Sequence, residues 1–120
     1  YFGNGCTYRF VEPAGATSLA AALAAGGPVT LPQVDNFVDG AAVARIGARN
    51  YAALAGFTPD HCMAIPEDRL CETMIDMLNV EGVVLEPAGA LAIDALRDLT
   101  GIAGKRIVCL EISISNACPM

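Results

Sequence analysis

The pentapeptide Glu-Pro-Ala-Gly-Ala occurs twice in this chain, at residues 12–16 and again at residues 86–90. Each copy follows a short β-prone run, residues 8–11 and 83–85, and leads into an Ala- and Leu-rich stretch that favours a helix. A strand that turns at Pro and Gly before a helix leaves backbone N–H groups free at the turn, where open α/β sheets place ligands. The repeat therefore predicts an α/β sheet and marks two places to look for a site.

The alternation of extended and helical segments continues through the rest of the chain. It predicts the α/β class, with a mostly parallel sheet covered on both faces in a three-layer αβα arrangement. Residues 106–112 are so apolar that we expect a buried parallel strand there, which needs sheet neighbours and is compatible with an incomplete sheet. Further strands are expected at residues 8–11 and 62–65, helices at 18–25, 40–54, from 66–68 onward and at 88–99, and an irregular segment at 31–39.

Two of the expected helices carry an apolar face at helical spacing. The later one opens with a proline in its first turn and two acids where the helix dipole favours them. The expected faces are Val43, Ile46, Tyr51 and Leu54 in the first helix, and Leu70, Met74 and either Met77 or Leu78 in the second.

Composition limits what this chain can be. It has 120 residues, of which 54% are hydrophobic, and a chain of this size buries only about two thirds of its unfolded surface. We therefore expect part of the apolar surface to pack against another chain or a missing portion of the same fold. No apolar run reaches the about 18 residues of a membrane span, and no signal-peptide pattern is present. The net charge of -6 argues against nucleic acid and indicates an acidic surface that favours solubility.

The cysteines do not form a metal-binding or disulfide pattern. Their number is odd and no two are spaced as Cys-x-x-Cys, which argues against a structural zinc site. We expect buried, reduced thiols of the kind found in cytosolic proteins. The five positions are Cys6, Cys62, Cys71, Cys109 and Cys118.

Four segments, in order, resemble threonine ammonia-lyases, also called threonine dehydratases. Residues 39–47 read Asp-Gly-Ala-Ala-Val-Ala-Arg-Ile-Gly, and residues 65–71 read Ile-Pro-Glu-Asp-Arg-Leu-Cys. Residues 81–91 contain the second pentapeptide, and residues 106–110 read Arg-Ile-Val-Cys-Leu. Each motif alone is a weak signal, whereas four in the family's order and spacing are a strong one.

The resemblance covers about residues 9–116 and implies a fold and an activity. These enzymes bind pyridoxal phosphate and have the tryptophan-synthase-β fold, known as fold type II. Residues 9–120 would be the C-terminal half of the cofactor-binding large domain, and residues 1–8 are left unassigned. Members remove the α-proton and β-hydroxyl of threonine or serine, giving 2-oxobutanoate or pyruvate plus ammonia. The implied partners are a small hydroxy amino acid and further copies or the remainder of the same enzyme.

Two other readings stay open. Serine dehydratases and serine or threonine racemases share these motifs, so the reaction could be a related one. Alternatively, the chain could be a non-catalytic domain that binds a partner half through an exposed apolar sheet edge.

The resemblance assigns Gly40 and Glu86 to the cofactor. Gly40 matches a position where the backbone passes close to the cofactor ring, an approach that a side chain would block. Its alternative role is a glycine at the start of a helix. Glu86 matches an acid beside the cofactor, and its alternative is a carboxylate held by backbone amides at a helix N-terminus.

The resemblance also assigns Ser113 and Asn116, which match a cofactor loop. The serine hydroxyl in that loop hydrogen-bonds the pyridine nitrogen without holding it protonated, which suits elimination chemistry. The family loop reads Ser-Gly-Gly-Asn, whereas this chain reads Ser-Ile-Ser-Asn. Ser115 is therefore the second choice for the contact with the pyridine nitrogen.

Two further assignments concern a cation and the cofactor lysine. Glu12 and the Ala16 carbonyl match a cation site of some relatives, where a mono- or divalent ion has a second carboxylate that is Ser18 here. The only lysine is Lys105, which we place in a surface turn and which does not match the family's Schiff-base lysine. The family's glycine-rich phosphate loop also has no match, so we expect this chain alone to be inactive.

Overall fold

A parallel pair of strands forms the centre of the fold. The computed structural model describes residues 5–54 and 56–110. In it, β1 (Phe10–Pro13) pairs in parallel with β2 (Cys62–Ile65), with Phe10 opposite Cys62 and Pro13 opposite Ile65. Both strands lie where the sequence predicts strands, and β1 is displaced from residues 8–11 by two positions.

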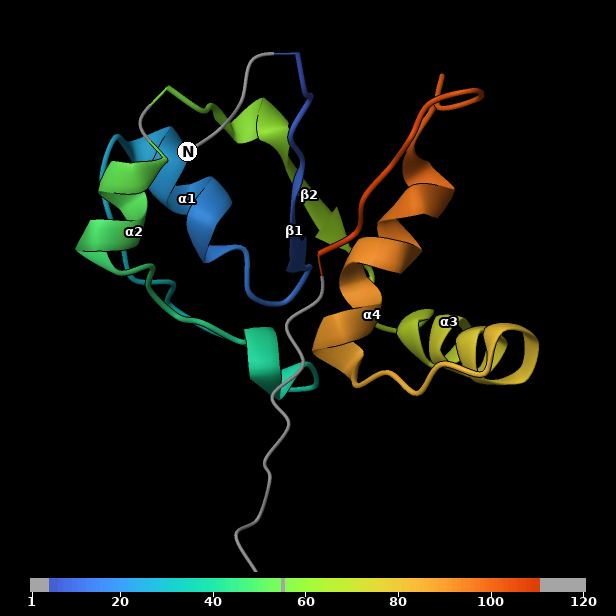
Figure 1. Ribbon diagram of the computed structural model, residues 1–120. Helices are drawn as coiled ribbons and strands as arrows, with labels where there is room; N and C mark the ends of the chain where they lie inside the picture. The colour runs from blue at the N-terminus through green and yellow to red at the C-terminus, as the bar shows by residue number, and fades with distance from the viewer. Residues whose placement is uncertain (1–4, 55, 111–120) are drawn as a thin grey trace, which may run out of the picture.

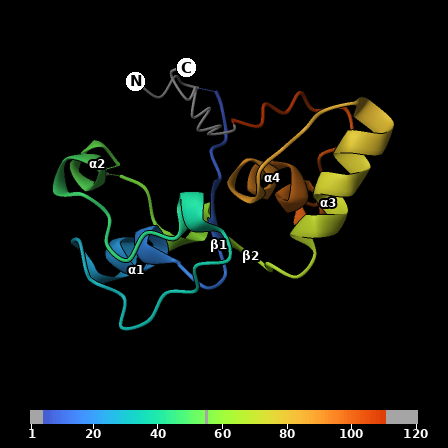
Figure 2. The same ribbon diagram turned by 90° about the horizontal axis from the view of Figure 1, so that it is seen from below.

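Helices cover both sides of this strand pair. The helices α1 and α2 lie on one side of the strands, and α3 and α4 lie on the other, in both views (Figures 1 and 2). This confirms the predicted α/β class with a parallel sheet. The helices are α1 (Ser18–Ala25), α2 (Ala48–Ala53), α3 (Leu70–Asp76) and α4 (Pro87–Asp94).

The helix α1 has the predicted bounds. Its alanines and leucines favour the helix, and it ends at Gly26, whose φ of 74° is the left-handed conformation that glycine adopts without strain. The Gly26 N–H donates to the Ala22 carbonyl, which satisfies one of the free carbonyl groups of the last turn.

The helix predicted over residues 40–54 is wrong in its first half. The chain forms a 3₁₀ turn, η1 (Asp39–Ala41), and enters α2 only at Ala48. Between them the backbone pairs with an earlier segment, because the Leu31 N–H donates to the Ala44 carbonyl at 2.8 Å. Val43 is consequently exposed and not part of a helical apolar face.

The helix α3 starts later than predicted. Residues 66–68 precede it, and the Leu70 N–H donates to the Glu67 carbonyl at 3.3 Å. Leu70 is fully buried and Met74 packs against the core, as predicted. The helix continues into a π-helical turn, η3 (Met77–Glu81), which shifts the helical register and leaves Leu78 exposed.

The two pentapeptides do not have the same local structure. In the first copy Pro13 ends β1, and a turn separates it from α1. In the second copy Pro87 is the first residue of α4, and residues 83–85 form no strand. Proline fits both places because its fixed φ suits a strand end and the first turn of a helix alike. The helix predicted over residues 88–99 is present as α4 followed by η4 (Ala95–Asp98).

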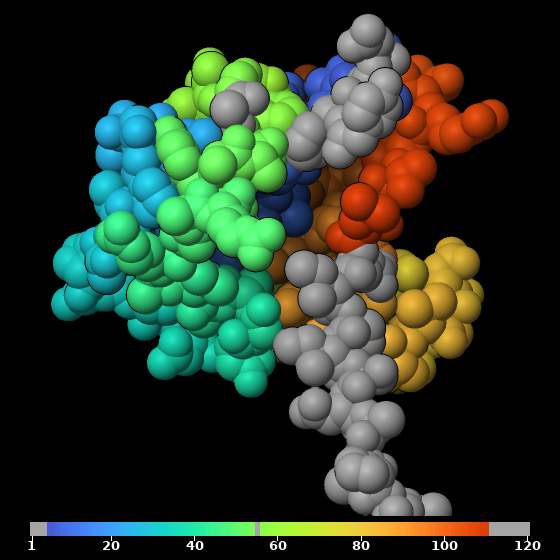
Figure 3. Space-filling view, turned by 60° about the vertical axis from the view of Figure 1, so that its left-hand side comes forward, coloured from blue at the N-terminus to red at the C-terminus, as the bar shows by residue number. Residues whose placement is uncertain are grey.

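The strand predicted over residues 106–112 is not formed in the part that the structure describes. Residues 105–110 have no regular secondary structure and join no sheet, and Val108 and Leu110 are 74% and 85% exposed. In Figure 3 the orange-red end of the described chain runs from the upper right edge toward the middle of the view. A buried parallel strand needs a neighbour on each side, and the described residues provide a sheet of only two strands.

The core lies between the strand pair and the α3–α4 layer. Its residues come from β2, α3, α4, η4 and the segment before η1, so it joins parts of the chain that are far apart. No helix within the described ranges is long and apolar enough to cross a membrane. The fully or nearly buried members of the core cluster are Val38, Ile65, Leu70, Ala90, Leu91 and Ala95.

The cysteines are less buried than predicted. Cys6 and Cys71 are exposed, and Cys62 and Cys109 are half-buried. Cys6, Cys62 and Cys71 are free thiols, the Cys109 thiol donates to the Ala92 carbonyl at 3.4 Å, and Cys118 lies outside the described residues. Aliphatic side chains such as those of Ala90 and Leu91 fill the core instead.

Candidate functional site

Gly40 and Glu86, far apart in the sequence, come together in the fold. Gly40 lies in η1 against the first turn of α4. A Cβ atom added to Gly40 would lie 3.1 Å from the Ala88 Cβ and 3.9 Å from the Glu86 Oε1. The Gly40 N–H donates to the Asp39 Oδ1 at 2.8 Å. Two of the four residues assigned to the cofactor are therefore neighbours, and Ser113 and Asn116 lie outside the described residues.

This is a close contact between two segments of the chain. Gly40 has no side chain and lies against the Ala88 methyl group, with the Glu86 carboxylate beside it. A larger residue at position 40 would have to displace the start of α4. Glu86 is also the N-cap residue of α4, where its side chain makes no capping bond.

Sequence reasoning missed a second close approach, at Gly15 in the first pentapeptide. The Gly15 N–H donates to the Glu67 Oε1 at 3.0 Å, and its carbonyl accepts from the Asp35 N–H at 3.0 Å. A Cβ atom on Gly15 would lie only 2.4 Å from the Asp35 Cβ and 2.7 Å from the Glu67 Oε1. The sequence features that could have indicated this close approach are the glycine of the first pentapeptide and the Pro-Glu pair directly after β2.

Glu12 binds the N-terminus of α1. Its two carboxylate oxygens accept from the Leu19 N–H at 2.6 Å and the Ala20 N–H at 3.0 Å. Burial raises the pKa of the Glu12 carboxyl above its usual value, and the two amide bonds act in the opposite direction. The carboxylate thus already has partners in the protein.

The cation site at Glu12 and Ala16 stays a prediction. Ala16 and Ser18 are both buried beside this turn. Across the described ranges, no group of three or more His, Cys, Asp or Glu side chains could hold a metal ion. The interaction that Glu12 does make is the one with the α1 amides.

Shallow hollows lie at the carboxyl ends of the two strands, where open α/β folds place ligands. They do not include Gly40 or Glu86, the two described residues that are assigned to the cofactor. Their volumes are about 530 Å³ and about 290 Å³. The first is lined by Gly15, Gln33, Val34 and Asp35, and the second by Asp35, Phe37, Glu67 and Asp68.

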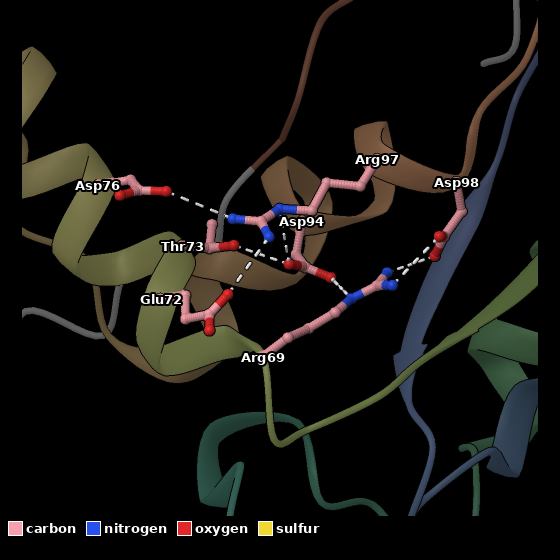
Figure 4. A network of polar contacts seen from close by, with 7 residues as sticks. All are labelled: Arg69, Glu72, Thr73, Asp76, Asp94, Arg97 and Asp98. Atoms are coloured by element: carbon pink, nitrogen blue, oxygen red, sulfur yellow. Dashed lines mark hydrogen bonds and ion pairs between the residues drawn. The ribbon is translucent and has the colours of Figure 1, made fainter.

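A network of ion pairs joins α3 to α4 (Figure 4). Asp94 is fully buried and accepts from the Arg69 Nε at 2.5 Å and from the Thr73 hydroxyl at 2.7 Å. The Arg69 guanidinium also pairs with Asp98, one turn further along. Arg97 reaches the Asp94 Oδ1 more loosely, at 3.5 Å. The buried carboxylate therefore has three polar partners.

Neighbouring charges and burial shift the titration of two surface groups and one thiol. Hydrogen bonds to Asp98 and Asp94 raise the pKa of Arg69, and the bond from Arg69 lowers the pKa of Asp98. Burial, with the charge of Glu12 as a second cause, raises the pKa of the Cys62 thiol to about 11. Cys62 is therefore protonated at neutral pH and a poor nucleophile.

Lys105 closes a surface turn, in agreement with its predicted place. It is exposed, and its N–H donates to the Ile102 carbonyl at 3.0 Å. It is the only lysine in the sequence. It comes from the segment after η4 and not from the neighbourhood of Gly40.

Comparison with known proteins identifies the family. Residues 3–112 match the family model described as pyridoxal-phosphate dependent enzyme. The biosynthetic L-threonine dehydratase of Corynebacterium glutamicum is 46% identical over 101 residues, which cover 83% of this chain and 23% of that protein. The corresponding Bacillus subtilis protein is 44% identical over 108 residues, covering 88% of this chain and 25% of that protein. The chain thus spans about a quarter of these relatives' length.

Solved structures of similar fold agree with this family match. A threonine deaminase from T.th. gives a TM-score of 0.66 at 27% identity, over 73% of this chain and 30% of that one. Maize serine racemase gives 0.62 at 27% identity, over 72% of this chain and 27% of that one. The match to the family model over nearly the whole sequence decides the assignment: the chain belongs to the family of pyridoxal-phosphate dependent enzymes.

Proposed function

We propose that the enzyme to which this chain belongs is a threonine ammonia-lyase. It would convert L-threonine to 2-oxobutanoate and ammonia, and L-serine to pyruvate and ammonia. The observation that carries the proposal is the juxtaposition of Gly40 and Glu86 at the start of α4. The 46% identity to an L-threonine dehydratase favours threonine as the substrate.

In this proposal the chain provides one wall of the cofactor site. When bound, pyridoxal phosphate supplies the electron sink for charge that develops at the substrate α-carbon. Because Gly40 has no side chain, the backbone there could pass close to the cofactor ring. The Glu86 carboxylate beside it would hold a proton and orient polar groups of the bound molecules.

Further parts of the proposal concern residues and partners. Ser113 would bond the ring nitrogen, with Ser115 as the second choice, and Asn116 would help to hold the ring. Residues 9–120 would form the C-terminal half of the large domain of a cytoplasmic, oligomeric enzyme. A cation at Glu12 would be an addition to the contacts with the α1 amides.

The test uses the whole enzyme loaded with cofactor. L-Threonine should yield 2-oxobutanoate and ammonia in equal amounts. Glu86→Gln, which keeps the shape but cannot hold the same proton, should lower kcat by about a hundredfold. Gly40→Ala should weaken cofactor binding by the apoenzyme, whereas Gly47→Ala should not, because a Cβ there would meet nothing closer than 4.0 Å.

A racemase is the second candidate, because maize serine racemase shares the fold at nearly the same TM-score. Racemisation would give D-serine from L-serine with little pyruvate. Chiral analysis of the remaining serine separates the two reactions. If D-serine forms faster than any keto acid, the lyase proposal is wrong.

A further inference from the structure

The short link between β2 and α3 contacts both pentapeptide regions. Within residues 66–69, the Glu67 carboxylate accepts from the Gly15 N–H in the turn of the first pentapeptide. Arg69, two positions later, binds Asp94 on the helix that the second pentapeptide starts. One link therefore holds two parts of the chain that are far apart in the sequence.

The first set of contacts connects Glu67 to the loop that leads to Gly40. The Gly15 carbonyl accepts from the Asp35 N–H, so the turn that Glu67 holds also holds the following loop. Gly15 makes room for this, because a Cβ there would fall 2.7 Å from the Glu67 Oε1. The Asp35 carboxylate in turn accepts from the Phe37 N–H at 2.9 Å.

That loop ends at Gly40. Val38 follows directly after Phe37, is fully buried in the core, and its carbonyl accepts from the Ala41 N–H at 2.9 Å, which closes the turn η1 around Gly40. The position of the Gly40 backbone thus depends on a loop tied at one end to Glu67 and at the other to the core.

The second set of contacts connects Arg69, through Asp94, to the helix that has Glu86 at its N-terminus. Arg69 and Thr73 both bind the buried carboxylate of Asp94, which fixes α4 against α3. Glu86 and Ala88 lie at the N-terminus of the same helix, where they meet Gly40. A helix is stiff over this length, so holding Asp94 also holds Glu86.

We infer that Glu67 and Arg69 are positioning residues for the reaction proposed above, setting the Gly40–Glu86 contact from both sides. The inference rests on the proposed function only for its kinetic readout. Small displacements at a reacting site lower turnover strongly, with losses of about a hundredfold per ångström. A purely structural role would lower stability and leave the site unchanged.

The experiment compares four forms of the whole cofactor-loaded enzyme: the parent, Glu67→Ala, Glu67→Gln and Asp68→Ala. Glutamine keeps an oxygen acceptor for the Gly15 N–H, and alanine removes it. Asp68 is an acid in the same link that makes no bond to Gly15, so it serves as the matched control. Each form is examined for kcat and KM, for the visible circular dichroism of the bound cofactor, and for its unfolding midpoint.

The inference expects Glu67→Ala to lower kcat by about ten- to a hundredfold and to change the cofactor dichroism. Glu67→Gln should retain at least about half of both signals, and Asp68→Ala should equal the parent. A Glu67→Ala enzyme with a lower unfolding midpoint but parental kcat and dichroism would overturn the inference.

Two further readouts keep the test decisive. If Glu67→Ala does not fold, Glu67→Asp replaces it, because the shorter carboxylate cannot keep the same reach to Gly15. The dichroism should then change in Glu67→Asp and not in Glu67→Gln, and equal signals in both overturn the inference. If the parent makes no 2-oxobutanoate, the proposed function fails, while the dichroism still decides whether Glu67 positions the cofactor site.

Discussion

The buried ion pair between Arg69 and Asp94 offers a sharp test of what holds α3 to α4. We predict that Arg69→Met destabilises this helix pair strongly, because it leaves a carboxylate with no exposed surface without its main counter-charge. Removing one partner of a buried pair costs about 3–5 kcal/mol. Here Thr73 at 2.7 Å and Arg97 at 3.5 Å remain on Asp94, so we expect about 2–3 kcal/mol.

The assay is hydrogen exchange of the amides in α3 and α4 of the whole enzyme, which reports the local opening free energy. A loss of about 2–3 kcal/mol means exchange roughly 30- to 160-fold faster. Arg97→Met is the matched control, because Arg97 lies 3.5 Å from Asp94, farther than Arg69, and its other partners Glu72 and Asp76 are 73% and 69% exposed. Exposed pairs contribute about 0–1 kcal/mol, so exchange should accelerate less than about fivefold.

The double variant Arg69→Met/Asp94→Leu separates charge burial from packing. Replacing both members of a buried pair by apolar residues of similar size is often neutral, so most of the lost protection should return. Equal effects of Arg69→Met and Arg97→Met would refute the reasoning. So would a double variant that exchanges as fast as Arg69→Met alone.

Three further predictions concern the turn at Gly15, the stability at low pH and the reactivity of the cysteine thiols. Gly15→Ala should cost about 1–3 kcal/mol by overpacking, because its Cβ would lie 2.4 Å from the nearest side-chain carbon, and exchange of the amides in the turn should report it. The lowered pKa of Asp98 means that its pairing with Arg69 stabilises the fold above the unfolded pKa of about 3.9 and is lost as the pH falls through the folded value. Protection of the α3 and α4 amides from hydrogen exchange should therefore depend less on pH at low pH in Asp98→Asn than in the parent. An equal pH dependence in both would contradict this. At pH 8 iodoacetamide should label the exposed Cys71 well before Cys62, whose pKa is raised to about 11, and equal rates by mass spectrometry would refute that order.

Local sequence signals predicted the elements that depend on local interactions. The helix α1 has its predicted bounds because alanines, leucines and a left-handed glycine suffice to start and end it. Residues 62–65 also form the predicted strand, although this strand pairs with β1 from a distant part of the sequence. The resemblance to threonine ammonia-lyases assigned Gly40 and Glu86 to the cofactor; the structure places them side by side, and their role stays a prediction.

Elements that depend on distant partners were not predictable in this way. Residues 42–47 have a helical apolar spacing, yet the bond from Leu31 to Ala44 holds them out of a helix. Residues 106–110 have the composition of a buried strand but join no sheet within the described part of the chain. The contacts of Glu67 and Arg69 also could not be read from spacing, because each side chain meets a partner on another element.

The pentapeptide itself shows why a repeated sequence need not repeat a structure. Glu12 binds the amides of α1, the helix that follows it, whereas Glu86 is the N-cap residue of α4 and lies close to Gly40. The difference lies in what precedes each copy: the first proline is the last residue of a paired strand, and an unpaired segment lets the second begin a helix. Both copies nevertheless depend on a missing side chain, at Gly15 for the first and at Gly40 opposite the second. Because Glu67 and Arg69 in the β2–α3 link reach both copies, substitution of these two residues together should disturb both turns, which local roles for the two copies would not allow.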